Sequence, residues 1–538
     1  MTDVEPTALR LAPGDPRAHF LLLRRALGAT LEAPVVRLVP HPDGRLVGPD
    51  GVATSLSDYR GPARERLVAG LSEVERARVE DLHDRLLVPV EAVAEATEAV
   101  VYAEGYRRVF ATLDALETSL GAQRFLAGGR GPTAADWFLY VVLLRFDPVY
   151  SPLYKLNRGR IDRARHLGPY LRDLYARDPA VDLVDFVAIK RHYFWADTEV
   201  NHRRVVPRGG VPDLARPHDR DRFDMATDRA RSVEEAPSAP ARPGSFVRGV
   251  SRHRHTIEPD PEARFPAEAG RYHLYIANNC PWCHRVALTR ALKGLEDVVT
   301  MDVLHYRRDP ERGWTFRPEV PGCTEDSVFG ATFVREIYAR EQSTERSVPL
   351  LIDRRTQSIV NNESAEIIRM LDRAFEAFAP DAAPRLCPPE RQAEIDALNA
   401  WVYADINNGA YKAGFAHDQV AYDIAFARFF AALARLEAML ADGRPYLLGD
   451  ALSEADVRLF PTIFRFDPVY FTRFRLNGAM VRDHVRLSAW HDRMLALPAV
   501  ARASNLDHCR QGYFGRTGNG IVPLGPEEAL SIPRAPDQ

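Results

Sequence analysis

The strongest constraint on the fold of this chain is an internal repeat. The segments TAADWFLYVVLLRFDPVYSPLYKLN (133–157) and SEADVRLFPTIFRFDPVYFTRFRLN (453–477) align without gaps at a spacing of 320 residues and share the hexamer RFDPVY. The match continues downstream, where HYF (192–194) aligns with GYF (512–514). Such self-similarity means that one structural unit occurs twice. We therefore expect the 538 residues to contain two related copies rather than one large core.

Both aligned segments have the spacing of apolar residues that is typical of packed helices. Each opens with a Ser/Thr-x-x-Asp pattern, Thr133 with Asp136 and Ser453 with Asp456. In a capping box, these two side chains satisfy backbone groups at a helix start. We favour this structural interpretation of the two Asp residues over a catalytic one.

The front of the second copy alternates between strand and helix patterns. The sequence predicts strands, a hairpin and helices in the order of a thioredoxin-like domain: strand 271–277, helix 282–294, strand 298–304, hairpin 348–360 and helix 364–375. From about residue 390 to about residue 500 the pattern is helical. The fold class is therefore α/β plus all-α.

The first copy keeps only a shortened form of this front part. At a spacing of 265 residues, DPRAH (15–19) aligns with CPWCH (280–284), so that Asp15 and Ala18 replace the two cysteines. Because the His of this motif occurs in both copies, as His19 and His284, we favour a packing role for it. The first copy has lost whatever chemistry the cysteines perform.

These patterns predict five segments along the chain. Residues 222–244 are rich in charge, Ala and Pro and lack periodicity, as is typical of a linker. The predicted segments are a truncated, cysteine-less thioredoxin-like remnant (1–62), a degenerate helical domain (63–221), the linker (222–244), a complete thioredoxin-like domain (245–385) and a second helical domain with its tail (386–538).

Composition excludes several classes of function. The formal net charge is −3 with both signs interspersed, so we expect neither nucleic acid nor membrane as a partner. The N-terminus lacks the basic start and apolar core of a signal peptide, which predicts a cytoplasmic protein. The cysteines are odd in number and scattered, which argues against a disulfide framework: Cys280, Cys283, Cys323, Cys387 and Cys509.

The motif CPWCH (280–284) is open to several interpretations. It matches the C-x-x-C-H pattern of covalent haem attachment, but that attachment occurs outside the cytosol. A structural zinc site needs two more ligands at short spacing, and the other cysteines are scattered, so we expect no metal. A general disulfide reductase would not need the long helical half. A thiol nucleophile at a helix start remains the favoured hypothesis.

A set of motifs in the second copy resembles the xi-class glutathione transferases, the glutathionyl-hydroquinone reductases. They follow the family order: GRYHLYIANNCPWCHR (270–285), GWTF (313–316), SVPLLID (347–353), IVNNESAEIIR (359–369), NNGAYKAGFA (407–416), EADVRLFPTIFRFDPVY (454–470) and IVPLGP (521–526). This resemblance implies a thioredoxin-like domain followed by a helical domain of the glutathione transferase type. The first copy is similar to the helical half and C-terminal extension of the same family.

The resemblance implies an activity for Cys280. In the family, a cysteine at this position attacks the sulfur of a glutathionyl-hydroquinone, releases the hydroquinone and is freed by a second glutathione. The physics agrees, because the dipole and the unpaired N–H groups of a helix N-terminus stabilise a thiolate.

The resemblance also implies residues for the thiol cosubstrate and the aromatic substrate. Trp314, Val348 and Pro349, the last expected to be cis, would line the thiol site, with Glu363 and Ser364 at the γ-glutamyl end. We also weigh a core role for Trp314 and Val348.

Tyrosine hydroxyls would face the aromatic substrate: Tyr411, Tyr470 and Tyr513. Tyr470 has a counterpart, Tyr150, in the copy without cysteines, which favours a structural role equally. Tyr411 aligns with Glu91 and is specific to the second copy.

Two departures from the family keep alternatives open. Cys283 stands where the family commonly has a small residue, which permits a disulfide with Cys280. The tail of the second copy, LDHCRQGYFGRTGNGIVP (506–523), is altered relative to the family. The interpretations are a reductase of the glutathionyl-hydroquinone type, an S-transferase or C–S lyase acting on a specialised metabolite, and a non-catalytic binding or scaffold protein.

The identity of the thiol and the state of assembly also stay open. Basic residues are nearly all Arg, which suggests a GC-rich genome and admits mycothiol as well as glutathione as the thiol. The expected partners are this thiol and an aromatic, quinone-like electrophile. Because family members pair through their helical domains, we expect the two copies to form an intramolecular pseudo-dimer, so that the chain can be monomeric.

Overall fold

The computed structural model describes residues 9–526, with gaps at 13, 30–34, 44, 51–52, 56–60, 130, 180, 197–200, 202, 224–250 and 516–519. The predicted linker 222–244 lies almost entirely outside the described residues. Within the described ranges, no helix is long and apolar enough to cross a membrane.

The second copy opens with the predicted thioredoxin-like arrangement. Its four-stranded sheet has the order β7-β6-β8-β9, in which β6 and β7 are parallel and the other neighbours antiparallel. The strands are β6 (Tyr272–Ile276), β7 (Thr300–Val303), β8 (Leu350–Asp353) and β9 (Ser358–Asn361). Every residue of β6 is buried, as expected of a central strand. The predicted strands and hairpin are confirmed.

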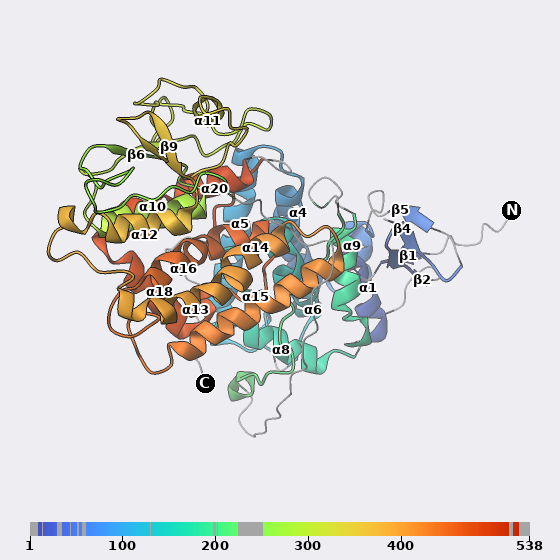
Figure 1. Cartoon of the computed structure of the whole chain (residues 1–538). Coiled ribbons are helices and arrows are strands. Elements are labelled where there is room, and N and C mark those ends of the chain that lie inside the picture. The colour runs from blue at the N-terminus through green and yellow to red at the C-terminus, as the bar shows by residue number, and fades with distance from the viewer. Residues whose placement is uncertain are drawn as a thin grey trace.

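Three helices accompany this sheet: α10 (Pro281–Leu292), α11 (Val334–Ala339) and α12 (Ser364–Arg373). Helix α10 packs against α12 and also against α16 (Glu454–Arg465) and α19 (Pro498–Ala503) of the helical domain. Figure 1 shows α10 and α12 between the strands β6 and β9 and the helices of this second domain. The start of α10 therefore lies where the thioredoxin-like and helical parts meet.

The helical part of the second copy confirms the predicted all-α half. Besides α16 and α19, its helices are α13 (Gln392–Trp401), α14 (Asn408–Gly414), α15 (Gln419–Met439), α17 (Phe471–Arg473), α18 (Val485–Leu495) and α20 (Leu506–Phe514). Their apolar faces form one core that includes Tyr470, Trp490 and Cys509.

The first copy repeats the helical half with a much reduced front. Its helices are α1 (Pro16–Ala26), α2 (Arg64–Val68), α3 (Glu73–Leu82), α4 (Val88–Glu95), α5 (Ala99–Ala122), α6 (Ala134–Leu143), α7 (Ser151–Leu153), α8 (Leu167–Arg177) and α9 (Phe186–Phe194). Strands β1 (Leu9–Leu11) and β2 (Val35–Arg37) pair in parallel around α1, which matches the relation of β6, α10 and β7.

A separate antiparallel sheet follows in the first copy. It consists of β3 (Val39–His41), β4 (Arg45–Val47) and β5 (Ala53–Ser55). Strands of only three residues carry too short a pattern to be predicted from sequence. Figure 1 shows these small sheets at the end of the molecule opposite to β6 and β9.

The repeated hexamer has the same structure in both copies. Phe146–Tyr150 and Phe466–Tyr470 each form a π-helical turn directly after a helix, α6 or α16. The capping boxes that start α6 and α16 form as predicted, because Thr133 and Ser453 each donate a hydrogen bond of 2.7 Å to their Asp partner. Both Asp136 and Asp456 are fully buried and accept further hydrogen bonds. Their role is structural.

The tails of the two copies cross over. Ile521, near the end of the second copy, is buried in the core of the first copy, and Val205 of the first copy is buried in the core of the second. The Lys155 ammonium donates to the Ile521 carbonyl at 2.7 Å. In the other direction, the Gln419 side chain exchanges two hydrogen bonds with the backbone of Val206, at 2.8 and 2.9 Å. Each copy therefore completes the hydrophobic core of the other.

Candidate functional site

A cavity of about 990 Å³ opens between the thioredoxin-like and helical parts of the second copy. Its lining residues all come from the second copy, between Ser251 and Tyr513. Eight of the ten site residues expected from the sequence line it: Cys280, Trp314, Val348, Pro349, Glu363, Ser364, Tyr411 and Tyr513. The other two, Cys283 and Tyr470, lie behind this lining.

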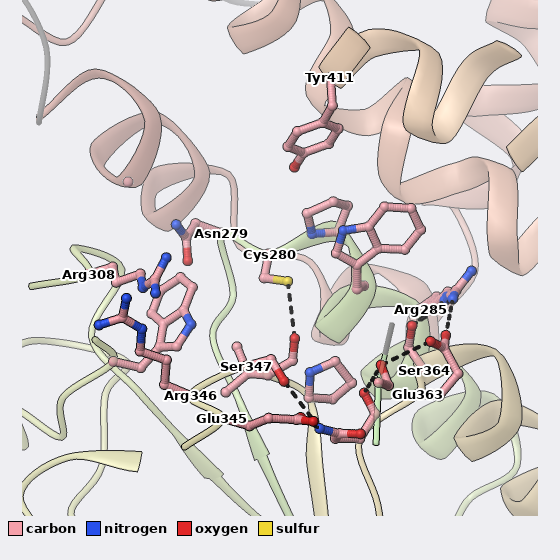
Figure 2. Close-up of a pocket in the computed structure, with 18 of the residues that line it drawn as sticks. Asn279, Cys280, Arg285, Arg308, Glu345, Arg346, Ser347, Glu363, Ser364 and Tyr411 are labelled. Atoms are coloured by element: carbon pink, nitrogen blue, oxygen red, sulfur yellow. Dashed lines mark hydrogen bonds and ion pairs between the residues drawn. The ribbon is translucent and has the colours of Figure 1, made fainter. Parts of the chain in front are cut away.

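Cys280 is the residue from which α10 begins. It occupies the N-cap position and is half-buried, with its sulfur 3.8 Å from the Val348 carbonyl oxygen. Figure 2 shows this sulfur pointing into the cavity below Tyr411. The dipole and the N–H groups at the first turn of α10 favour a negative charge on such a sulfur. The position suits a nucleophilic thiolate.

Cys283 lies one turn further along α10 and is fully buried. Burial, together with a hydrogen bond to Cys280 and the charge on that sulfur, raises the pKa of Cys283 well above its usual value. Its thiol therefore stays protonated and can donate to the Cys280 sulfur. Neither cysteine forms a disulfide.

The part of the cavity next to the Cys280 sulfur contains the predicted cis peptide bond. The Val348–Pro349 peptide bond is cis, as expected. Val348 is buried and half-buried Trp314 lies nearby along the lining. Both residues line the cavity and also contact the core of the sheet, so a core contact does not exclude the thiol-site role predicted for them.

The start of α12 forms a polar corner of the cavity. Glu363 is the N-cap of this helix and accepts from the Ala365 N–H at 3.2 Å. The buried Arg285 guanidinium donates to the Ser364 hydroxyl at 2.6 and 3.0 Å and lies 3.5 Å from the Glu363 carboxylate. Arg285 was not expected from the sequence. It fixes the two residues predicted for the γ-glutamyl end.

Three tyrosine hydroxyls meet on the helical side. The Tyr513 hydroxyl forms hydrogen bonds with those of Tyr411 and Tyr470, the latter at 3.2 Å. Tyr470 is fully buried and its ring is stacked on Phe474. Desolvation raises the pKa of all three phenols, so they remain protonated donors. Tyr411 and Tyr513 face the cavity, whereas Tyr470 holds Tyr513.

Arginines of the cavity were missed by the sequence analysis. Figure 2 shows Arg308 and Arg346 on one side of Cys280, with Arg285, Glu363 and Ser364 on the other. Burial, followed by the charge of Arg346, lowers the pKa of Arg308. Arg473 lies on the tyrosine side. Arg473 replaces the Leu153 of the first copy, so a position-by-position comparison of the repeats could have found it.

A buried Arg–His pair anchors the start of α10 to the helical part. The Arg465 guanidinium donates to His284 Nδ1 at 2.8 Å and to the Asn278 carbonyl at 2.7 Å. In the first copy, Arg145 donates to His19 Nδ1 at 3.1 Å and to the Gly14 carbonyl at 2.7 Å. Because this network occurs in both copies, the packing role favoured for His284 agrees with its surroundings.

The corresponding place in the first copy holds charged side chains. Asp15 caps α1, and burial raises its pKa. The Arg17 guanidinium, at the position of Trp282, donates to the Glu91 carboxylate at 2.6 Å. Above the start of α1, the His192 ring lies so close to Gly14 that a Cβ there would be 2.3 Å from that of His192. Within the described residues, no group of His, Cys, Asp and Glu in either copy is arranged to hold a metal ion.

Comparison with known proteins relates both copies to one family. The model for the glutathione S-transferase C-terminal domain matches twice, over residues 99–177 and 419–493, and the N-terminal domain model matches residues 279–374. The second match of the C-terminal model confirms the duplication expected from the repeat.

Individual relatives are similar over about half of the chain. Glutathionyl-hydroquinone reductase YqjG of Escherichia coli is 41% identical over 307 residues, which cover 55% of this chain and 93% of that protein. The xi-class glutathione transferase of Natrialba magadii has 41% identity and a TM-score of 0.50, covering 52% of this chain and 87% of that one. The xi transferase ECM4 of Saccharomyces cerevisiae, solved in complex with glutathione, has 33% identity and a TM-score of 0.50 over 53% of this chain and 98% of its own. The chain belongs to the xi-class glutathione transferases, the family of the glutathionyl-hydroquinone reductases.

Proposed function

We propose that the second copy is a thiol-dependent reductase that removes glutathione from a glutathionyl-hydroquinone or a similar aromatic thioether. The observation that carries this proposal is the position of Cys280. Its sulfur lies at a helix start, between the polar corner of Glu363 and Ser364 and the hydroxyls of Tyr411 and Tyr513. A thioether with glutathione on one side and a phenol on the other would place its sulfur at Cys280.

The proposed reaction has two balanced steps. First, the Cys280 thiolate attacks the glutathionyl sulfur, a Cys280–glutathione disulfide forms and the bond from sulfur to the ring carbon breaks. The electron pair stays on the aromatic ring, which takes up a proton and leaves as hydroquinone. Second, the thiolate of another glutathione attacks this disulfide, giving oxidised glutathione and free Cys280. Tyr411 and Tyr513 would donate to the oxygen that gains negative charge in the first step.

We propose glutathione rather than mycothiol as the thiol. Glutathione carries a carboxylate at each end, and the two sides of Cys280 differ in a way that suits it. Arg308 and Arg346 supply positive charge for the glycine carboxylate, while Glu363 and the start of α12 suit the amino and carboxylate groups of the γ-glutamyl end. Mycothiol, whose cysteine is linked to sugars, has no carboxylate for the arginine pair.

We propose that Cys283 is not required for turnover. Its thiol is fully buried behind Cys280, so an incoming glutathione has direct access to the disulfide at Cys280 but not to Cys283. The raised pKa of Cys283 keeps it from competing as a thiolate. Its hydrogen bond to Cys280 would assist the nucleophile without forming a disulfide.

We propose that the chain is an intramolecular pseudo-dimer with one working site and that it is a cytoplasmic monomer. The crossed tails and the hydrogen bonds between Arg160 and Gly478 and between Arg482 and Arg158 support this pairing. The cysteines form no disulfide, which suits a reducing compartment. The domain boundaries predicted from the sequence stay predictions.

Steady-state turnover tests the proposal. Purified protein, Cys280→Ser and Cys283→Ser would each receive glutathionyl-hydroquinone with glutathione or with mycothiol. We expect wild type and Cys283→Ser to release hydroquinone with glutathione, and Cys280→Ser to lose more than about 1,000-fold in kcat/KM. Folded wild-type protein that is inactive with both thiols would contradict the reaction and favour a different electrophile. Equal rates with mycothiol would contradict the choice of thiol.

A further inference from the structure

Arg473 is a cationic side chain on the aromatic side of the cavity to which the reaction above assigns no role. It is the last residue of α17 and lines the cavity together with Tyr411, Phe474 and Tyr513. Its Nε donates to the Tyr513 carbonyl at 3.2 Å. Over the described part of the chain, the structure contains no ion pair between this guanidinium and a carboxylate. Arg473 therefore lines the cavity without an ion-pair partner among the described residues.

The two carboxylates that line the cavity are engaged elsewhere. Glu363 caps α12 and lies beside Arg285. Glu345 accepts hydrogen bonds from the Asn362 side chain and the Arg252 N–H. A cation in a partly dehydrated, aromatic environment is costly unless an anion is close. Since the described residues provide none for Arg473, we take a bound ligand as the source of this anion.

The repeat supports a ligand-related role. The equivalent residue of the first copy is Leu153, which is buried and packs in an apolar core. The framework residues Arg145 and Arg465, by contrast, are the same in both copies and fully buried. A positive charge at position 473 therefore belongs to the copy with the thiol and the cavity, not to the shared framework.

We propose that Arg473 binds an anionic group on the aromatic part of the electrophile. This inference rests on the proposed function and narrows its substrate class to aromatic thioethers that carry a carboxylate or a similar anion on the ring. The glutathionyl part would extend away from Tyr411, from Arg308 and Arg346 on one side of Cys280 to Glu363 on the other. The ring would lie against the tyrosines, with its anion on Arg473.

Binding of the released aromatic product can be measured without turnover, so it tests the anion site independently of the proposed reaction. Three ligands would be titrated calorimetrically into Cys280→Ser protein: hydroquinone, 2,5-dihydroxybenzoate and the neutral 2,5-dihydroxybenzamide, of which the last two have nearly equal shape. We expect the carboxylate to bind about 10-fold or more tightly than the amide. Arg473→Leu, which copies the first copy, should remove this preference and leave the binding of the amide unchanged. Arg473→Lys should retain part of it.

Other outcomes would overturn the inference. Equal binding of 2,5-dihydroxybenzoate and 2,5-dihydroxybenzamide would mean that Arg473 binds no anion. A preference for the carboxylate that persists in Arg473→Leu would mean the same. Equal weakening of all three ligands would assign Arg473 only to holding Tyr513. Arg486→Leu is the matched control, because it removes a half-exposed guanidinium that lies outside the cavity. A carboxylate preference without turnover of any thioether would contradict the proposed reaction and leave the anion site standing.

Discussion

In the first copy, charged side chains stand at the positions of the reactive and aromatic groups of the second: Asp15 for Cys280, Arg17 for Trp282 and Glu91 for Tyr411. The framework around these positions is nevertheless the same, down to the buried Arg–His pair and the π-helical turn. The difference teaches that packing and chemistry occupy separable residues in this fold. The first copy has lost the two cysteines and still shares hydrophobic cores with the second copy.

The two copies also differ in which side chain fills the space at the start of α1 and α10. In the second copy, the Asn279 side chain fills the space next to Gly512, and in the first copy His192 fills the space next to Gly14. Asn279 aligns with Gly14, and Gly512 aligns with His192. The same gap is thus filled from opposite sides. In the first copy this places an imidazole over the start of α1.

The tyrosines provide the sharpest test of the comparison by turnover. Tyr411→Phe and Tyr513→Phe should each lower kcat/KM about 10- to 100-fold, because they remove donors to the developing negative charge. Tyr470→Phe should have a smaller effect, since Tyr470 lies behind the cavity lining and its hydroxyl contacts that of Tyr513. Tyr193→Phe, the counterpart of Tyr513, should leave kcat/KM unchanged. Steady-state assays with glutathionyl-hydroquinone measure all four, and equal losses for Tyr193→Phe and Tyr513→Phe would break the comparison.

The crossed tails predict that the two copies unfold together. Ile521→Ala should lower the free energy of unfolding by about 3 kcal/mol, because this buried side chain completes the core of the other copy. Val205→Ala should cost about 2 kcal/mol for the same reason in the second copy. Urea denaturation followed by circular dichroism measures both. Exposed Val485→Ala is the control and should change little. Two separate transitions would contradict mutual completion of the cores.

The Arg17–Glu91 pair of the first copy should matter for stability alone. Arg17→Met leaves the Glu91 carboxylate without its partner, but Glu91 is 40% exposed, so solvent screens much of the loss. We expect about 0.5–1 kcal/mol in urea denaturation, with turnover unchanged. The double variant Arg17→Met/Glu91→Gln should recover part of this stability. A loss of turnover in Arg17→Met would indicate that the first copy takes part in the reaction.

The raised pKa values of the three tyrosines lead us to expect no loss of kcat/KM at moderately high pH. Burial raises the pKa of Tyr411, Tyr470 and Tyr513, so the protonated donor form persists above the usual tyrosine pKa of about 10. The kcat/KM profile should therefore show no descending limb from about pH 8 to about pH 10. A fall within that range that is present in folded wild-type protein and absent from Tyr411→Phe or Tyr513→Phe would show that one phenol ionises normally.

Local patterns predicted much of this fold. The strands, the hairpin, helices α10 and α12 and the capping boxes follow from periodicity and from Ser/Thr-x-x-Asp spacing. The motifs also predicted eight residues of the cavity lining. The exchange of tails was not predicted, because it depends on contacts such as that between Lys155 and Ile521, 366 positions apart.

The roles of individual residues at the site could be assigned only from the structure. Tyr470 and Tyr411 carry the same functional group, and only packing decides that one supports Tyr513 while the other faces the cavity. Arg285 donates a hydrogen bond to Ser364, and Arg473 donates one to the Tyr513 carbonyl. In both cases the two residues are far apart in the sequence. Where the repeats differ, as at Arg473 and Leu153, comparison of the two copies offers a signal that a single pattern does not.

Mass spectrometry of the trapped intermediate tests most directly whether one thiol, Cys280, carries the chemistry. Protein would be mixed with glutathionyl-hydroquinone in the absence of free thiol, and released hydroquinone would be quantified alongside. We predict one glutathionyl group per chain on the peptide that contains Cys280, one equivalent of hydroquinone, the same result for Cys283→Ser and no adduct for Cys280→Ser. An adduct on another cysteine, or hydroquinone released without an adduct because Cys283 has displaced the glutathione, would contradict this account.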